Sequence, residues 1–211
     1  DFLPYVQDIP EEVAKKAKYM VVSLPSNPVG SIATPGLYEE IIAFAKKYDI
    51  LIIHDNAYSD IIFDGAHGGS FLATEGAKEI GVELRKLRSQ IDFGMFLPIQ
   101  KAAIAALNGP LESVQEQCRM YQERRDALCN GLREIGWDLP NGKGTMFVWA
   151  RIPGGRTDSM AFCMELMEKA GVIVTPGASF GPHGEGYVRF ALVLPPEKIR
   201  EVVEAIRKSG I

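Results

Sequence analysis

Long apolar runs and an excess of positive charge are both missing from this sequence. No stretch approaches the roughly 20 consecutive apolar residues that a transmembrane helix needs. The net charge is −4 and the sequence pI is about 5.5, so no global positive field gathers nucleic acid or anionic lipid. We therefore expect small molecules as partners, and neither a nucleic acid nor a membrane.

Cysteine is scarce as well, since only Cys118, Cys129 and Cys163 occur. Their number is odd, and none stands in a C-x-x-C spacing or beside a histidine pair. This pattern argues against a disulfide framework and against a metal site, so we assign no metal. Reduced thiols are typical of reducing compartments, which predicts a cytoplasmic protein.

What is present has the composition of an ordinary globular protein. The chain has 211 residues, of which 46% are hydrophobic and 24% are charged. That is enough to bury one large or two small cores, so the composition excludes disorder but selects no function. The chain opens at Asp1 without a methionine, which predicts a fragment.

The first half reads as a strand–helix–strand unit. A short polar helix is predicted over 11–18 and an apolar, β-rich strand over 19–24, which Pro and Gly then stop. Thr34 is predicted to cap a helix that ends near Asp49. The continuously apolar run 50–54 then predicts a buried parallel strand, and hence an α/β fold with a mostly parallel, doubly wound sheet.

The second half changes character from Gly109 onward. We predict a long helix over 112–135, a strand over 146–152, a helix over 158–170, a strand over 187–194 and a closing amphipathic helix. This order predicts a second domain. We therefore expect residues 1–108 to form part of a large domain and residues 109–211 to form a C-terminal α+β small domain.

The junction after Glu83 has no turn chemistry. Residues 81–83 resemble the start of a buried strand, yet 84–88 continue at once as a basic helix. Chains rarely pass from strand to helix without Gly, Pro, Asn or a cap. We therefore predict that a segment is missing here and that Glu83 and Leu84 are not neighbours in the complete protein.

Three polar residues follow the two predicted strands of the first half. Asn27 lies in a proline-bracketed turn after the first strand, and Asp55 and Tyr58 follow the second, at the edge where open α/β sheets bind ligands. Taken singly, each has an ordinary explanation as a turn residue, a cap or packing. We expect the three to converge.

The order Asn-Pro-x-Gly, helix, buried strand, Asp-x-Ala-Tyr resembles the pyridoxal-phosphate site of class I/II aminotransferases of fold type I. The resemblance continues through residues 94–104, 144–149 and 175–181 and covers essentially the whole chain, with the alanine and LL-diaminopimelate aminotransferase branch as the most similar. It implies pyridoxal 5'-phosphate as the cofactor. In that case Asp55 pairs with the pyridine nitrogen, while Asn27 and Tyr58 hydrogen-bond the phenolic oxygen.

Arg189 stands in the predicted strand 187–194. Alternation along the strand puts Val188, Phe190 and Leu192 on one side and Arg189 on the other. The pattern alone leaves a solvated strand face about as reasonable as a ligand contact. The family resemblance implies that Arg189 binds the substrate's α-carboxylate through a bidentate fork.

The sequence also departs from the family pattern. The Ser-x-x-Lys segment that carries the Schiff-base lysine and a phosphate-binding arginine are expected soon after Gly81, and neither is found there. Lys86 and Lys101 match no Schiff-base position, so the catalytic lysine is unknown. Val29 replaces the threonine that is most frequent at its position, which is a mild change.

The resemblance implies amino transfer between an α-amino acid and a 2-oxo acid, in a homodimer. One alternative is a lyase or decarboxylase of the same fold, which would share Asp55, Tyr58 and Arg189. Another is a catalytically inactive, truncated chain that acts only in assembly or binding.

Overall fold

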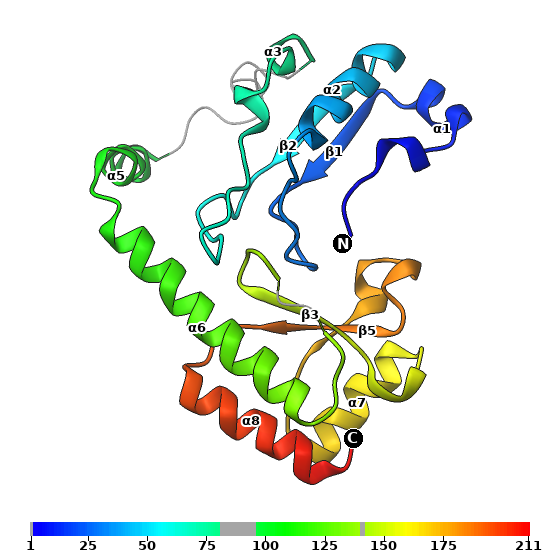
Figure 1. Cartoon of the computed structure of the whole chain (residues 1–211). Coiled ribbons are helices and arrows are strands. Elements are labelled where there is room, and N and C mark those ends of the chain that lie inside the picture. The colour runs from blue at the N-terminus through cyan, green and yellow to red at the C-terminus, as the bar shows by residue number, and fades with distance from the viewer. Residues whose placement is uncertain (1, 81–95, 140–141) are drawn as a thin grey trace.

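The computed structural model describes residues 2–80, 96–139 and 142–211, which form two lobes (Figure 1). The first lobe contains the two-stranded sheet β1–β2, and the second contains the three-stranded sheet β3-β5-β4. The main elements in chain order are α1 Glu11–Lys16, β1 Tyr19–Ser23, α2 Leu37–Tyr48, β2 Leu51–Asp55, α3 Ala77–Ile80, α5 Leu97–Asn108, α6 Glu112–Glu134, β3 Phe147–Arg151, α7 Ser159–Ala170, β4 Thr175–Pro176, β5 Tyr187–Ala191 and α8 Pro196–Ser209. The predicted mixture of helix and sheet is confirmed, and the predicted break at Glu83 lies outside the described residues.

The first lobe is built on the predicted βαβ unit. Strands β1 and β2 pair in parallel, with Tyr19 opposite Leu51 at one end and Ser23 opposite Asp55 at the other. Helix α2 joins them and turns its apolar face, including the fully buried Ile41, towards the sheet. The parallel unit predicted from the apolar pattern is therefore confirmed.

The start of α2 differs from the prediction. The helix begins at Leu37 after Gly36, whose φ of 88° only glycine adopts readily, and no side chain caps it. Thr34 contributes its backbone carbonyl instead, which accepts a hydrogen bond from the Leu37 N–H at 3.2 Å. The predicted cap by the Thr34 side chain is therefore wrong, because Gly36 supplies the turn. The helix ends as predicted, at Asp49 in the left-handed conformation.

Only one face of the β1–β2 sheet is covered in the described part of the chain. Val22 is buried on the side of α2, whereas Tyr19 and Val21 on the opposite face are 64% and 58% exposed. Parallel sheets are normally covered on both faces, and the continuous apolar run over 50–54 predicted a buried strand of this kind. Asp55 pairs with Ser23, so strand alternation places it on the uncovered face with Tyr19 and Val21.

In the second lobe, α6, α7 and α8 lie together against the antiparallel sheet (Figure 1). Asp158 caps α7 by accepting a hydrogen bond from the Ala161 N–H at 2.8 Å, and Gly171 ends the helix with a φ of 68°. Among the apolar residues of α7, Phe162 is fully buried, whereas Met167 is 39% exposed. The core of this lobe includes Leu128, Leu132, Trp137, Val148, Phe162, Leu166, Val188, Phe190, Leu192 and Ile206.

We expect the variant Phe162→Ala to lower the free energy of unfolding by about 3–5 kcal/mol. Phe162 is fully buried and packs edge-on against Trp137 at 5.8 Å, so truncation leaves a cavity in the middle of the lobe. Urea denaturation followed by circular dichroism measures the change. A loss below about 1 kcal/mol would show that the helices collapse around the site, against the packing described here.

None of the side chains of α5 is buried, and its apolar members include Leu97, Ile104 and Leu107. Within the described ranges, no helix combines the length and apolarity that a bilayer crossing requires.

Candidate functional site

The ends of β1 and β2 lead into two loops at the same edge of the sheet. The Leu24 N–H donates to the Asp55 carbonyl at 3.2 Å, which continues the strand pairing to this point. After β1, a turn is closed by hydrogen bonds from Ser26 N–H to the Ser31 carbonyl and from Gly30 N–H to the Ser26 carbonyl. Asn27 lies at the exposed tip of this turn. The parallel pairing therefore brings the Asn27 turn beside the Asp55 loop.

Arg189 reaches from β5 of the second lobe to this turn. Its Nη1 donates to Asn27 Oδ1 at 2.9 Å, and its Nη2 donates to Thr175 Oγ1 at 3.2 Å. The guanidinium carbon lies 4.2 Å from the ring centroid of Phe147 and 4.9 Å from that of Phe180. The fork is thus held between two aromatic rings, which fixes its orientation.

The environment of Arg189 suits an anionic ligand. Val188 and Phe190 are buried on the helix side of the strand, which confirms the predicted alternation. The Arg189 Nε is buried and has no hydrogen-bond partner among the described residues, and the acceptors that meet its Nη atoms are neutral. Burial lowers the pKa of Arg189, while Tyr58 opposes this shift. A half-buried cation with neutral neighbours is a natural site for a carboxylate.

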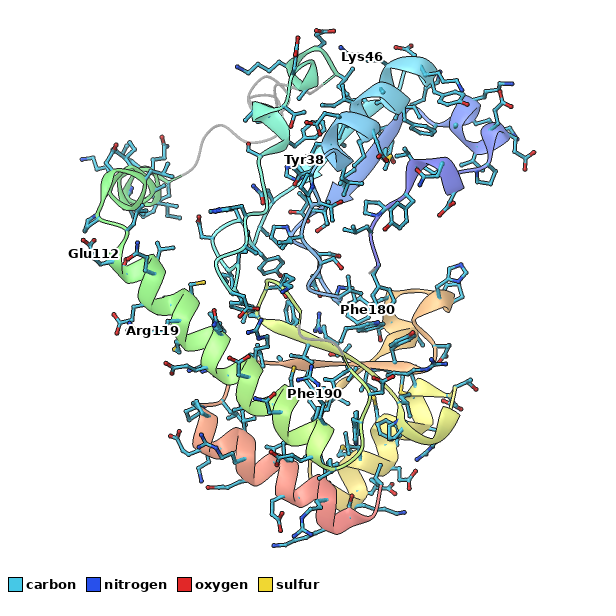
Figure 2. All side chains as sticks on the ribbon, in the orientation of Figure 1. Tyr38, Lys46, Glu112, Arg119, Phe180 and Phe190 are labelled. Atoms are coloured by element: carbon cyan, nitrogen blue, oxygen red, sulfur yellow. The ribbon has the colours of Figure 1, made fainter. Side chains whose placement is uncertain are left out.

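Tyr58 joins the same group through an aromatic contact. Its ring lies edge-on to that of Phe147, with 6.0 Å between the ring centroids. The Phe147 ring in turn contacts the Arg189 guanidinium. The structure therefore places Tyr58, Phe147, Arg189 and Asn27 together between the two lobes. Phe180 lies in this region and Phe190 lies deeper, among the helices (Figure 2).

Asp55 is the last residue of β2, and its side chain is exposed. The preceding residue, His54, points to the opposite face, where its Nε2 lies 3.3 Å from the Tyr38 hydroxyl and its ring packs against Phe71. Burial lowers the pKa of His54. These contacts anchor the end of the strand and so fix the backbone from which Asp55 projects.

The sequence alone did not identify Phe147, Phe180 and Thr175 as members of this site. Thr175 pairs with Arg189 in the β4–β5 register, and Trp149 pairs with it in the β3–β5 register. The sequence predicts which side of its strand Arg189 occupies. It does not predict the pairing register of the strands, which determines the neighbours of Arg189.

A cavity of about 340 Å³ lies near the Asn27 turn. Its walls are mainly apolar and include Val29, Ile32 and Trp149, with Lys143 at the side. Among the described residues, no group of three or more His, Cys, Asp or Glu side chains could hold a metal ion. Burial raises the pKa of the Cys129 and Cys163 thiols to about 11. The reactive groups of the site are thus an amide, a phenol, a carboxylate and a guanidinium.

An ion pair lies at the junction of the lobes, between Asp64 and Arg125. Hydrogen bonding from Arg125 lowers the pKa of Asp64 below its ordinary value of 3.8. A carboxyl group with a depressed pKa in the folded state stabilises the fold at pH values above its unfolded-state pKa. This stabilisation is lost as the pH falls through the folded-state pKa. We therefore expect the stability difference between the parent protein and Asp64→Asn to stay constant from neutral pH to about pH 5 and to shrink below about pH 4.

Urea denaturation at stepped pH values measures this difference, with Asp60→Asn, an exposed carboxylate in the same loop, as the control. A gap that widens on acidification would contradict the assignment.

Comparison with known proteins places this geometry in a family. The family model described as aminotransferase class I and II matches residues 1–82 and 65–206. The LL-diaminopimelate aminotransferase of Halothermothrix orenii is 40% identical over 238 aligned residues, which cover 100% of this chain and 61% of the relative. That of Moorella thermoacetica is 41% identical over 98% of this chain and 60% of the relative.

Solved structures give the same result. The apo-BacF structure from Bacillus subtilis is 34% identical, with a TM-score of 0.91, and covers 100% of this chain and 60% of that one. A probable N-succinyldiaminopimelate aminotransferase from Thermus thermophilus is 32% identical, with a TM-score of 0.90, and covers 98% of this chain and 62% of that one. The chain thus spans about 60% of the length of these relatives.

The alignment with the curated relative is longer than this chain. The family model matches in two parts that overlap over residues 65–82, and the second part extends from 65 to 206. The alignment with the H. orenii relative extends over 238 positions, whereas this chain has 211 residues, a difference of 27. The relative therefore has at least that many aligned positions without a counterpart in this chain.

Proposed function

Because the chain belongs to the class I and II aminotransferase family, we propose that it transfers an amino group between an α-amino acid and a 2-oxo acid with pyridoxal 5'-phosphate as the cofactor. The observation that carries the proposal is the placement of Arg189. Its guanidinium is held between two rings beside Asn27, with a buried Nε that has no partner among the described residues. This arrangement suits the α-carboxylate, the group that all α-amino acids share.

The residues at the sheet edge fit the ring of the cofactor. Asp55 offers an exposed carboxylate that would pair with the pyridine nitrogen of the cofactor and favour its protonated form. Asn27 and Tyr58 offer an amide and a phenol for the ring oxygen. The bound cofactor supplies an electron sink for charge that develops at the α-carbon of the substrate.

Each of these residues has a defined task in that reaction. Arg189 orients the amino acid by its α-carboxylate, and Phe147 and Phe180 hold the fork in position. Because Arg189 also donates to Asn27, carboxylate binding is coupled to the residue that contacts the cofactor ring. The guanidinium is half-buried against these rings, and partial removal from water strengthens its interaction with an anion.

The proposal extends to the substrate class and to the cellular context. We propose α-amino acids with an aliphatic stem, because the neighbouring cavity has apolar walls formed by Val29, Ile32 and Trp149. We further propose a cytoplasmic homodimer, with residues 1–108 as part of a large domain and 109–211 as a small domain. Two separate cores, around Ile41 and around Phe162, support this division.

Transfer of label tests the proposal directly. The protein is incubated with pyridoxal phosphate, 2-oxoglutarate and one ¹⁵N-labelled amino acid at a time: alanine, aspartate or LL-diaminopimelate. Amino transfer places ¹⁵N in glutamate and converts the donor to its 2-oxo acid. A lyase or decarboxylase releases labelled ammonia, an amine or a shortened product instead, and that outcome would replace the proposed function.

A specific observation favours the inactive alternative. No Ser-x-x-Lys segment follows Gly81 in the sequence. Without that lysine, the chain lacks the amine that holds the cofactor covalently in this family. Borohydride reduction after incubation with pyridoxal phosphate, followed by intact mass measurement, decides the matter. A protein of 23.2 kDa with no stoichiometric adduct supports the inactive chain.

A further inference from the structure

Arg125 is the one arginine among the fully buried side chains of the described residues, with 1% of its surface exposed. It projects from α6 and forms a bidentate pair with Asp64, at 2.9 Å from Nη1 and 3.0 Å from Nη2. Its Nε also donates to Asp126 on the same helix at 2.9 Å, and its guanidinium lies 4.8 Å from the ring centroid of Phe63. These partners together compensate for the burial of the charge.

Asp64 belongs to the loop that carries Tyr58, and α6 holds this loop at two further points. The Asp64 N–H donates to Gln122 Oε1 at 3.1 Å, and the Cys118 thiol donates to the Ile62 carbonyl at 2.7 Å. Gln122 and Cys118 lie one and two turns before Arg125 on the helix. The loop from the first lobe is therefore fastened along one side of α6.

Arg125 also holds the loop that leads into β3. Its Nη1 donates to the Gly142 carbonyl at 2.9 Å. From this loop, the Lys143 and Gly144 N–H groups donate to the Gly30 carbonyl at 3.0 and 3.2 Å, and Gly30 closes the Asn27 turn. The same loop pairs with the loop of Asp64 through Thr145 N–H to the Ile61 carbonyl at 2.8 Å.

The packing at this junction leaves little freedom for adjustment. A Cβ atom at Gly144 would lie 2.7 Å from the Ile61 carbonyl oxygen. The three loops that carry Asn27, Tyr58 and Phe147 therefore meet backbone to backbone, and one guanidinium bonds two of them to α6.

We propose that Arg125 is a positioning residue, whose pair with Asp64 sets the relative placement of the first lobe, with Asn27 and Tyr58, and the second lobe, with Arg189. The inference deepens the proposed function and rests on it for its catalytic meaning. Its physical basis is geometric: a planar fork that bonds a carboxylate bidentately fixes both distance and angle, which a lysine cannot do.

A distance measurement between the lobes tests the inference without any ligand. Spin labels are attached to cysteines that replace Glu40 on α2 and Glu201 on α8, both exposed. Cys118→Ser removes the half-buried thiol but retains its donor, and Cys129 and Cys163 are buried. Electron paramagnetic resonance then gives the distribution of distances between the labels.

We expect a single narrow distribution for the parent protein and a distribution about twofold broader, or shifted, for Arg125→Met and Asp64→Asn. Arg125→Lys keeps the charge but not the fork, so it should restore the parent distribution only in part. Should Arg125→Met fail to fold, Asp64→Asn still decides, because it is isosteric. An unchanged distribution in Asp64→Asn would overturn the inference.

Two matched controls separate positioning from loss of stability. Asp126→Asn removes the other carboxylate partner of Arg125, which lies on the same helix and joins no lobes, so the distribution should not change. Leu166→Ala destabilises the core of the second lobe away from the junction, and should lower stability without moving the labels. Broadening in Leu166→Ala equal to that in Asp64→Asn would reduce Arg125 to a structural role.

The catalytic consequence is measured separately. Where amino transfer is observed, Asp64→Asn should raise KM for each amino acid at least about fivefold while kcat changes less, because Arg189 is displaced from Asn27. A lower kcat with an unchanged KM would overturn the inference. A failure of the proposed function would leave the label distances intact, so the two failures are distinguishable.

Discussion

Replacing Arg189 with methionine should weaken the binding of every α-amino acid and of 2-oxoglutarate by on the order of 100-fold. The reason is the loss of a bidentate, charge-assisted pair, in which each hydrogen bond contributes about 1.5–3 kcal/mol, while about 1.4 kcal/mol corresponds to a tenfold change in affinity. The rings of Phe147 and Phe180 remain in the variant. They have no polar hydrogen to donate to a carboxylate, so they do not compensate for this loss.

Isothermal titration with 2-oxoglutarate measures the effect even where turnover is absent. Arg189→Lys keeps the charge and loses the fork, and should weaken binding by about tenfold. Arg151→Met, an exposed arginine at the end of β3, is the matched control and should bind normally. A loss confined to one substrate would instead make Arg189 a residue for side-chain specificity.

The sequence predicted the framework of the first lobe because its signals are local. The apolar run of β2 and the periodic face of α2 determine a strand and a helix, and right-handed crossover connections leave a parallel pairing as the natural outcome. The cap at Thr34 was misassigned because Gly36 lies between it and the helix, and a left-handed glycine outweighs a capping hydroxyl there.

The residues of the candidate site were readable only in part. Asn27, Asp55 and Tyr58 follow strands that sequence can locate, so their approximate placement was predictable. Phe147 and Phe180 were not, because they reach Arg189 through strand register and through a loop that folds back on the sheet. Short-range patterns carry no information about either.

The buried pair of Arg125 and Asp64 is another feature that the sequence did not predict. In sequence, Arg125 lies in a run of charged helix residues that predicts a solvated face. In the structure it is buried, because the loop after Tyr58 folds over α6 and supplies a carboxylate 61 positions away in sequence. Such a partner can be recognised only from the tertiary structure.

Asp55→Asn should reduce turnover by on the order of 10²–10³-fold, the range observed when one preorganised electrostatic group is removed from an active site. The carboxylate of Asp55 is the proposed partner of the pyridine nitrogen, and an anion within about 4–6 Å raises the pKa of such a nitrogen by about 1–3 units. The amide keeps the shape of the side chain but removes this charge. The substitution should therefore change the protonation of the ring nitrogen and not the stability of the fold.

Two measurements separate these effects. A pH titration of the absorbance of bound pyridoxal phosphate should show the lowered pKa of the ring nitrogen in Asp55→Asn. Urea denaturation should show a change in stability within about 0.5 kcal/mol, since the side chain is exposed. Asp60→Asn, in the following loop, is the matched control and should leave both the titration and turnover unchanged. Near-normal turnover in Asp55→Asn, with an unshifted ring nitrogen, would refute the role proposed for Asp55.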